Sequence, residues 1–138
     1  MEPNKIHMYT DGACSGNPGS AGIGVYMKYN DHTKEISEGI GVATNNVAEL
    51  KAIKAGLEAL TIKDKPIIIY SDSAYCIGLF TKDWNPTKNL ELINEIQTLI
   101  NTFDNIEFVK VKGHSNNHGN NRADALAVAG KGKNNGIT

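Results

Sequence analysis

Four acidic residues in this chain combine residue type and position in a way that suggests chemistry: Asp11, Glu49, Asp72 and Asp124. Carboxylates that crowd together repel one another, so a cluster implies either raised pKa values or a bound hard cation. Magnesium prefers oxygen ligands and commonly binds through a few carboxylates plus substrate phosphates. Two such ions, about 3.5–4 Å apart, clamp the attacking and leaving oxygens of an in-line displacement at phosphorus. The set therefore predicts a two-metal site that cleaves phosphodiesters, although any one of these acids alone would be read as a plain surface carboxylate.

Two of the acids, Asp11 and Asp72, stand at the ends of expected strands. Residues 5–11 form a β-prone run and residues 67–72 a continuous apolar run, and each run ends in an aspartate. Residues 12–19 are rich in glycine and are expected to be a loop, which would leave Asp11 at the carboxyl end of its strand.

The other two acids lie on expected helices. Residues 45–60 carry apolar side chains at helical spacing, which predicts a helix with Glu49 near its start. Asp124 opens a second expected helix over residues 121–129. Acids at strand ends and helix starts can share the crevice at the carboxyl edge of a parallel-type sheet. The remaining pattern predicts strands over 22–29, 33–42 and 106–112, a hairpin turn at 30–32, and helices over 73–80 and 90–103.

Length and composition set the broad class. The chain has 138 residues and a net charge of −1, which predicts a single domain over residues 1–138 with a flexible tail from about residue 130. Apolar runs are too short to span a bilayer and no signal-peptide pattern is seen, so we expect a cytoplasmic protein with no membrane partner. Cys14 and Cys76 are too few for a disulfide framework and are expected to be free thiols.

Five segments, in order along nearly the whole chain, resemble the type 1 ribonucleases H: residues 9–14 with 16–19, 44–50, 70–73, 111–114 and 120–124. The resemblance implies a ribonuclease H-like α/β fold, a five-stranded mixed sheet of three antiparallel and two parallel strands flanked by helices. It also implies an endonuclease that hydrolyses the RNA strand of RNA–DNA hybrids and leaves 3′-hydroxyl and 5′-phosphate ends.

The same resemblance implies roles for particular residues. Asp11 would bridge two Mg²⁺ ions, with Mn²⁺ as an alternative metal, Glu49 and Asp72 would complete one ion's shell, and Asp124 would hold the other. His114 lies in a glycine- and asparagine-rich loop, where it would move protons or help product leave. Contacts with the hybrid are expected from a further set: Gly12, Cys14, Asn17, Thr44, Asn45, Asn46, Ser73 and Trp84.

Some of these residues have plainer alternatives. One of Thr44, Asn45 and Asn46 is expected to cap the helix that follows. For Arg122, a plain surface arginine is favoured over a contact with Asp124 or phosphate. Residues 81–88 lack the basic, tryptophan-rich insertion with which many type 1 enzymes grip DNA. We therefore expect a monomer that binds hybrids weakly and in a salt-dependent manner. Two other functions stay open: a related nuclease or strand-transfer enzyme on the same fold, and a module that binds nucleic acid with little or no cleavage.

Overall fold

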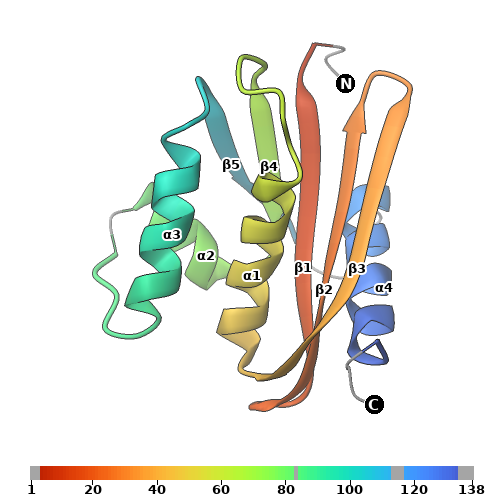
Figure 1. The fold of residues 1–138 in the computed structure, drawn as a ribbon, viewed down its shortest axis with the longest axis vertical. Coiled ribbons are helices and arrows are strands. Elements are labelled where there is room, and N and C mark those ends of the chain that lie inside the picture. The colour runs from red at the N-terminus through yellow and green to blue at the C-terminus, as the bar shows by residue number, and fades with distance from the viewer. Residues whose placement is uncertain (1–3, 83, 113–116, 134–138) are drawn as a thin grey trace.

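The structure is a computed structural model that describes residues 4–82, 84–112 and 117–133 (Figure 1). Within these residues, five strands and four helices follow one another along the chain: β1 (Ile6–Gly16), β2 (Gly19–Tyr29), β3 (His32–Ala43), α1 (Asn45–Glu58), β4 (Ile67–Ser71), α2 (Ala74–Thr81), α3 (Leu90–Ile100), β5 (Ile106–Lys110) and α4 (His118–Lys131). None of the described helices is both long and apolar enough to cross a membrane.

The strands form one mixed sheet in the order β3-β2-β1-β4-β5. β1, β2 and β3 pair antiparallel, whereas β4 pairs parallel with both β1 and β5. Figure 1 shows α1 and α3 on one face of this sheet and α4 on the other. The expected fold class, three antiparallel strands extended by two parallel ones and flanked by helices, is confirmed.

The main core lies between the sheet and α1. Leu50, Ile53 and Leu57, three of the apolar residues at helical spacing, are fully buried, as are Met8 of β1 and Ile69 of β4. Burying a side chain of this size stabilises the fold by about 1.5–3 kcal/mol relative to leaving it exposed. This packing holds α1, and with it Glu49, against β1.

On the opposite face, α4 packs directly on the backbone of β2. A Cβ atom added at Gly24 would lie 2.2 Å from the carbonyl oxygen of Ala123, and one at Gly22 would lie 2.5 Å from that of Ala127. Only glycine permits so close an approach. The two glycines therefore fix the distance between the sheet and the helix that carries Asp124.

The structure corrects the expected loop at residues 12–19. β1 continues to Gly16 and pairs with β2 down to Gly19, with Gly12 opposite Ile23. Pairing with a long neighbouring strand overrides the low β-propensity of a glycine-rich segment. Asp11 consequently lies in the middle of β1 and not at its end.

Some other expected boundaries were also wrong. α4 begins at His118, not at residue 121, and runs to Lys131, so that Asp124 lies in its second turn. α3 ends at Ile100, three residues early, and β5 ends at Lys110, two residues early. Helix ends depend on capping contacts and strand ends on their partners, neither of which the hydrophobic pattern reports.

Candidate active site

The difference in length between β1 and β4 brings two aspartates together. The parallel ladder between these strands runs as far as Tyr9 opposite Tyr70, and β4 stops at Ser71. Asp72 then leaves the sheet at the level where Asp11 continues along β1. The expected placement of Asp72 at the carboxyl end of its strand is confirmed.

Glu49 reaches the same place from α1. The backbone of Gly12, next to Asp11, lies against this helix, and a Cβ atom added there would be 2.6 Å from the carbonyl carbon of Ala48 and 2.7 Å from the amide nitrogen of Glu49. One carboxylate oxygen from each of Asp11, Glu49 and Asp72 lies within 4.8 Å of the other two. The structure thus brings three of the four predicted acids into one cluster.

Asp124 completes the set from the other face of the sheet. It forms a hydrogen bond with Asp11 and lines a cavity of about 220 Å³ together with the other three acids. The cavity is lined by Asp11, Gly12, Glu49, Asp72, Asn120, Asn121 and Asp124. All four acids singled out from the sequence therefore converge on one cavity.

Electrostatics in this cavity disfavour negative charge. Burial raises the pKa of Glu49 to about 10, and the neighbouring charges of Asp11 and Asp72 add to the effect. Burial likewise raises the pKa of Asp11 to about 8, with the charge of Asp72 and the hydrogen bond with Asp124 as further causes. Carboxyl groups in such surroundings hold protons at neutral pH unless positive charge is supplied.

The donor set fits a hard divalent cation. Glu49 Oε1 is buried and has no hydrogen-bond partner among the described residues, which is costly for a polar atom unless something else satisfies it. The cluster offers oxygen ligands only, as Mg²⁺ prefers. A cation at this point would satisfy Glu49 Oε1 and offset the charge that burial penalises.

Asn120 and Asn121 line the cavity although sequence reasoning did not select them as site residues. Asn120 is buried, with 2% of its surface exposed, and it precedes Asp124 by one helical turn. Residues four apart lie on the same face of a helix. That spacing is the signal that would have found Asn120 once Asp124 had been chosen.

The expected hybrid-binding residues around the start of α1 have structural partners. Thr44 caps α1, since its hydroxyl accepts a hydrogen bond from the Val47 amide at 3.2 Å. Asn17, in the β1–β2 turn, accepts one from the Asn45 amide at 2.9 Å. Asn45 and Asn46 are exposed at this helix start. The contacts join the β1–β2 hairpin to α1 and leave two asparagine side chains at the surface.

The other expected contact residues are more scattered. Cys14 donates from its thiol to the Ala43 carbonyl at 3.4 Å, and burial raises its pKa. Ser73 caps α2 by accepting from the Cys76 amide. Trp84 is 47% exposed, its ring lies over Gly78, and it does not line the acidic cavity. His114 lies outside the described residues.

The chain is thus an α/β protein in which a mixed sheet, together with α1 and α4, gathers four carboxylates in one cavity, and three of them could hold a metal ion. Residues 3–131 match the RNase H family. The chain belongs to this family.

Similar proteins agree in sequence and in structure. A ribonuclease H from Rippkaea orientalis is 41% identical, over 91% of this chain and 85% of the relative. The RNase H1 structure from the archaeon Halobacterium salinarum covers 91% of this chain and 96% of its own, with 31% identity and a TM-score of 0.78. The structure of LC11-RNase H1 in complex with an RNA/DNA hybrid covers 93% of this chain and 97% of its own, with 28% identity and a TM-score of 0.78.

Proposed function

We propose that this chain is an endoribonuclease that hydrolyses the RNA strand of RNA–DNA hybrids with two Mg²⁺ ions, leaving 3′-hydroxyl and 5′-phosphate ends. The observation that carries the proposal is the convergence of the four acids, from β1, α1, the end of β4 and α4, on one cavity. Membership of the RNase H family supports the reaction class, and the similarity to LC11-RNase H1, which was solved with an RNA/DNA hybrid, supports the substrate.

Each acid has a distinct part in holding the cations. Asp11 interacts with all three other acids: it is hydrogen-bonded to Glu49 and Asp124, and the charge of Asp72 raises its pKa. Asp11 would therefore bind both ions. Glu49 and Asp72 would hold one ion and Asp124 the other. When bound, the cations supply the positive charge that activates a water nucleophile and stabilises the leaving oxygen. With that positive charge beside them, Asp11 and Glu49 would be ionised at neutral pH.

Selectivity for RNA requires that the 2′-hydroxyl be read beside the cavity. Gly12 lines the cavity itself, and Asn17 and Asn45 lie where the β1–β2 turn meets the start of α1. The exposed side chains of Asn45 and Asn46 and the dipole at this helix end are suited to hydroxyl and phosphate oxygens. We propose this corner of the molecule as the contact with the strand that is cut.

A cleavage assay tests the function. A labelled RNA–DNA hybrid is incubated with the protein and Mg²⁺, and separately with Mn²⁺, beside matched duplex DNA, matched duplex RNA and a chelator control. We expect cleavage of the RNA strand of the hybrid alone, lost with the chelator, and products whose ends can be typed by phosphatase treatment and ligation. Binding of the hybrid without cleavage in either metal would instead support a non-catalytic module.

A further inference from the structure

Asn120 is a buried polar residue that lines the cavity, but the roles proposed above for the four acids do not involve it. It is only 2% exposed, and its Oδ1 has no hydrogen-bond partner among the described residues. Buried polar atoms are almost always paired, so this acceptor calls for a donor that the described residues do not provide. Asn120 is one of the residues that line the cavity, together with Asp11 and Asp124.

The acids cannot be that donor in the working enzyme. An ionised carboxylate only accepts hydrogen bonds, as a carboxamide oxygen does. Among the described residues no donor is left, whereas a group bound in the cavity can bring one. A hydrated Mg²⁺ ion brings donors, because this cation keeps several of its waters when a few carboxylates bind it.

Helix geometry places Asn120 on the same side of α4 as Asp124, the residue that would hold the second ion. The two residues are four apart in α4 and lie on one face of the helix. The backbone of Asn120 is fixed, since its amide donates to the Asn117 side chain at 2.9 Å in the helix cap.

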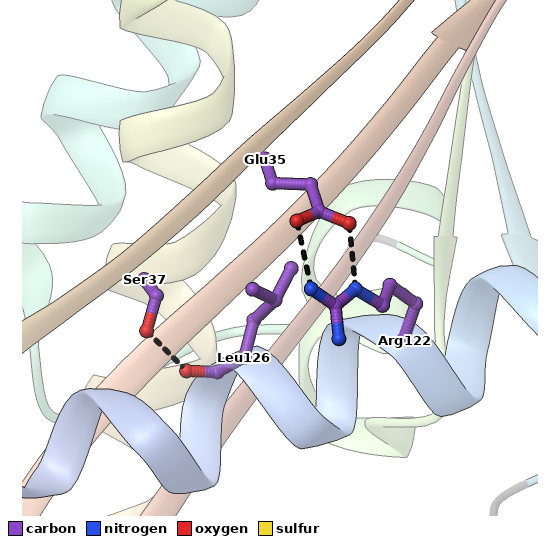
Figure 2. Close-up of polar contacts among 4 residues, drawn as sticks. All are labelled: Glu35, Ser37, Arg122 and Leu126. Atoms are coloured by element: carbon purple, nitrogen blue, oxygen red, sulfur yellow. Dashed lines mark hydrogen bonds and ion pairs between the residues drawn. The ribbon is translucent and has the colours of Figure 1, made fainter.

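Contacts with β3 hold the helix in this orientation. Figure 2 shows Arg122 paired with Glu35, and Ser37 donating to the carbonyl of Leu126. By helical spacing, Arg122 and Leu126 lie on a different side of α4 from Asn120 and Asp124. The helix is thus anchored to β3 on one side, while Asn120 and Asp124 line the cavity.

We propose that Asn120 is a fifth residue of the metal centre, whose Oδ1 accepts a hydrogen bond from a water of the hydrated cation held by Asp124. Asn120 thereby orients that water and strengthens cation binding without being a direct ligand. The inference rests on the proposed function, because it requires a cation in the cavity. Hydrogen-bonding residues around metal sites commonly contribute about 10- to 100-fold to metal affinity.

The test is Mg²⁺ binding to the full chain, measured by titration calorimetry without nucleic acid. Asn120→Ala is expected to weaken Mg²⁺ binding by about 10-fold or more. Asn120→Asp keeps an acceptor oxygen at the same place and should bind Mg²⁺ at least as tightly as the wild type. If Asn120→Ala does not fold, as judged by circular dichroism, Asn120→Leu removes the acceptor while keeping most of the volume and carries the same expectation.

A matched control separates metal binding from helix stability. Ala129→Gly, at an exposed position of the same helix outside the cavity, should lower the melting temperature while leaving Mg²⁺ affinity within about twofold of wild type. Equal weakening by Ala129→Gly and Asn120→Ala would overturn the inference, as would unchanged affinity in Asn120→Ala. If the wild-type chain binds no Mg²⁺, the proposed metal site itself fails. If the wild type binds and Asn120→Ala binds equally well, only the role of Asn120 fails.

Discussion

Arg122 and Glu35 form a two-point ion pair across 87 positions of the chain, with Nε to Oε2 at 2.6 Å and Nη2 to Oε1 at 2.8 Å (Figure 2). The pair joins α4 to the edge strand β3, two residues from Asp124. Hydrogen bonding to Arg122 holds the pKa of Glu35 below its ordinary value. Arg122 is a surface residue, as the sequence favoured over a contact with Asp124 or phosphate, but its pairing with Glu35 was not predicted.

Breaking this pair should have a small, salt-sensitive effect. Both side chains are more than a third exposed, so water and ions screen their attraction. Glu35→Gln is expected to lower the melting temperature at low salt by no more than about 3 °C, and the difference should shrink in about 1 M salt. Restoration of wild-type stability by the exchange Glu35→Arg with Arg122→Glu would show that the pairing, and not either side chain alone, is responsible. An equal loss at low and high salt would rule out an electrostatic origin.

Asp11→Asn should abolish hybrid cleavage and leave the fold intact. The change removes a charge shared by the proposed ions and alters little volume. Losing several kcal/mol of transition-state stabilisation corresponds to a rate reduction of roughly 1,000-fold. Single-turnover cleavage measures the rate, and circular dichroism confirms the fold. Full activity in this variant would exclude the role assigned to Asp11.

The acidic cluster also predicts how stability depends on pH when a chelator keeps metals away. In the folded chain the pKa values of Asp11 and Glu49 lie above their ordinary values near 4, at about 8 and about 10. The folded state therefore binds protons more tightly than the unfolded state. The stability from this difference is fully present below about pH 4 and is lost as pH rises through the folded-state pKa values. We expect the denaturation midpoint to decrease as the pH is raised from 6 to 9. Added Mg²⁺ should restore much of the lost stability.

Asp11→Asn is the control for this pH dependence. The neutral amide cannot lose a proton, so the variant should be more stable than wild type at pH 8 with a chelator, and its midpoint should change less with pH. Added Mg²⁺ should stabilise the variant less than it stabilises wild type. If the stability of the two proteins changes with pH in the same way, the titration of Asp11 does not contribute to the pH dependence of folding.

The central geometry was largely predictable from the sequence. Asp72 follows an apolar strand and Glu49 precedes the buried stripe of α1, so these two acids could be expected at the same edge of the sheet. Asp124 was also correctly assigned to a helix, although that helix begins at His118. These features are local in sequence and follow from hydrophobic period alone.

What could not be predicted depends on partners distant in sequence. The segment from Gly12 to Gly16 has loop-like composition, yet it is a strand because β2 supplies hydrogen bonds along its whole length. The pairing of Arg122 with Glu35 depends on how α4 lies across β3. The buried position of Asn120 likewise emerges only when α4 is placed on the sheet. Residue type and spacing do not encode these relationships on their own.

The close approach of Gly12 to α1 makes this position sensitive to a single methyl group. Gly12→Ala would place a Cβ atom 2.7 Å from the Glu49 amide nitrogen and 2.6 Å from the backbone of Ala48, so α1 must shift away from β1. Overpacking of this kind typically costs about 1–3 kcal/mol. The shift would also separate Glu49 from Asp11. We expect a lower denaturation midpoint together with weaker Mg²⁺ binding.

Gly132→Ala is the matched control, because a Cβ atom there would meet Ala129 O at an ordinary 3.6 Å. It should change the denaturation midpoint little and leave Mg²⁺ binding as in wild type. Equal behaviour of the two alanine variants would mean that the contact between Gly12 and α1 does not constrain the cavity.

Hybrid binding should be weak and fall steeply with salt. The net charge is −1, and residues 81–88 lack a basic insertion, so we expect few contacts between cationic side chains and phosphates. With two or three phosphate contacts, affinity should fall roughly 10- to 40-fold between about 50 mM and 200 mM salt. Fluorescence anisotropy with Asp11→Asn in Ca²⁺ measures binding without cleavage.

The same titration with Lys88→Ala added to this variant tests whether a lysine from the α2–α3 connection contributes. Loss of one phosphate contact should reduce the slope of log affinity against log salt by about 0.9. Tight binding that is insensitive to salt would mean that base stacking or hydrogen bonding, and not charge, holds the hybrid.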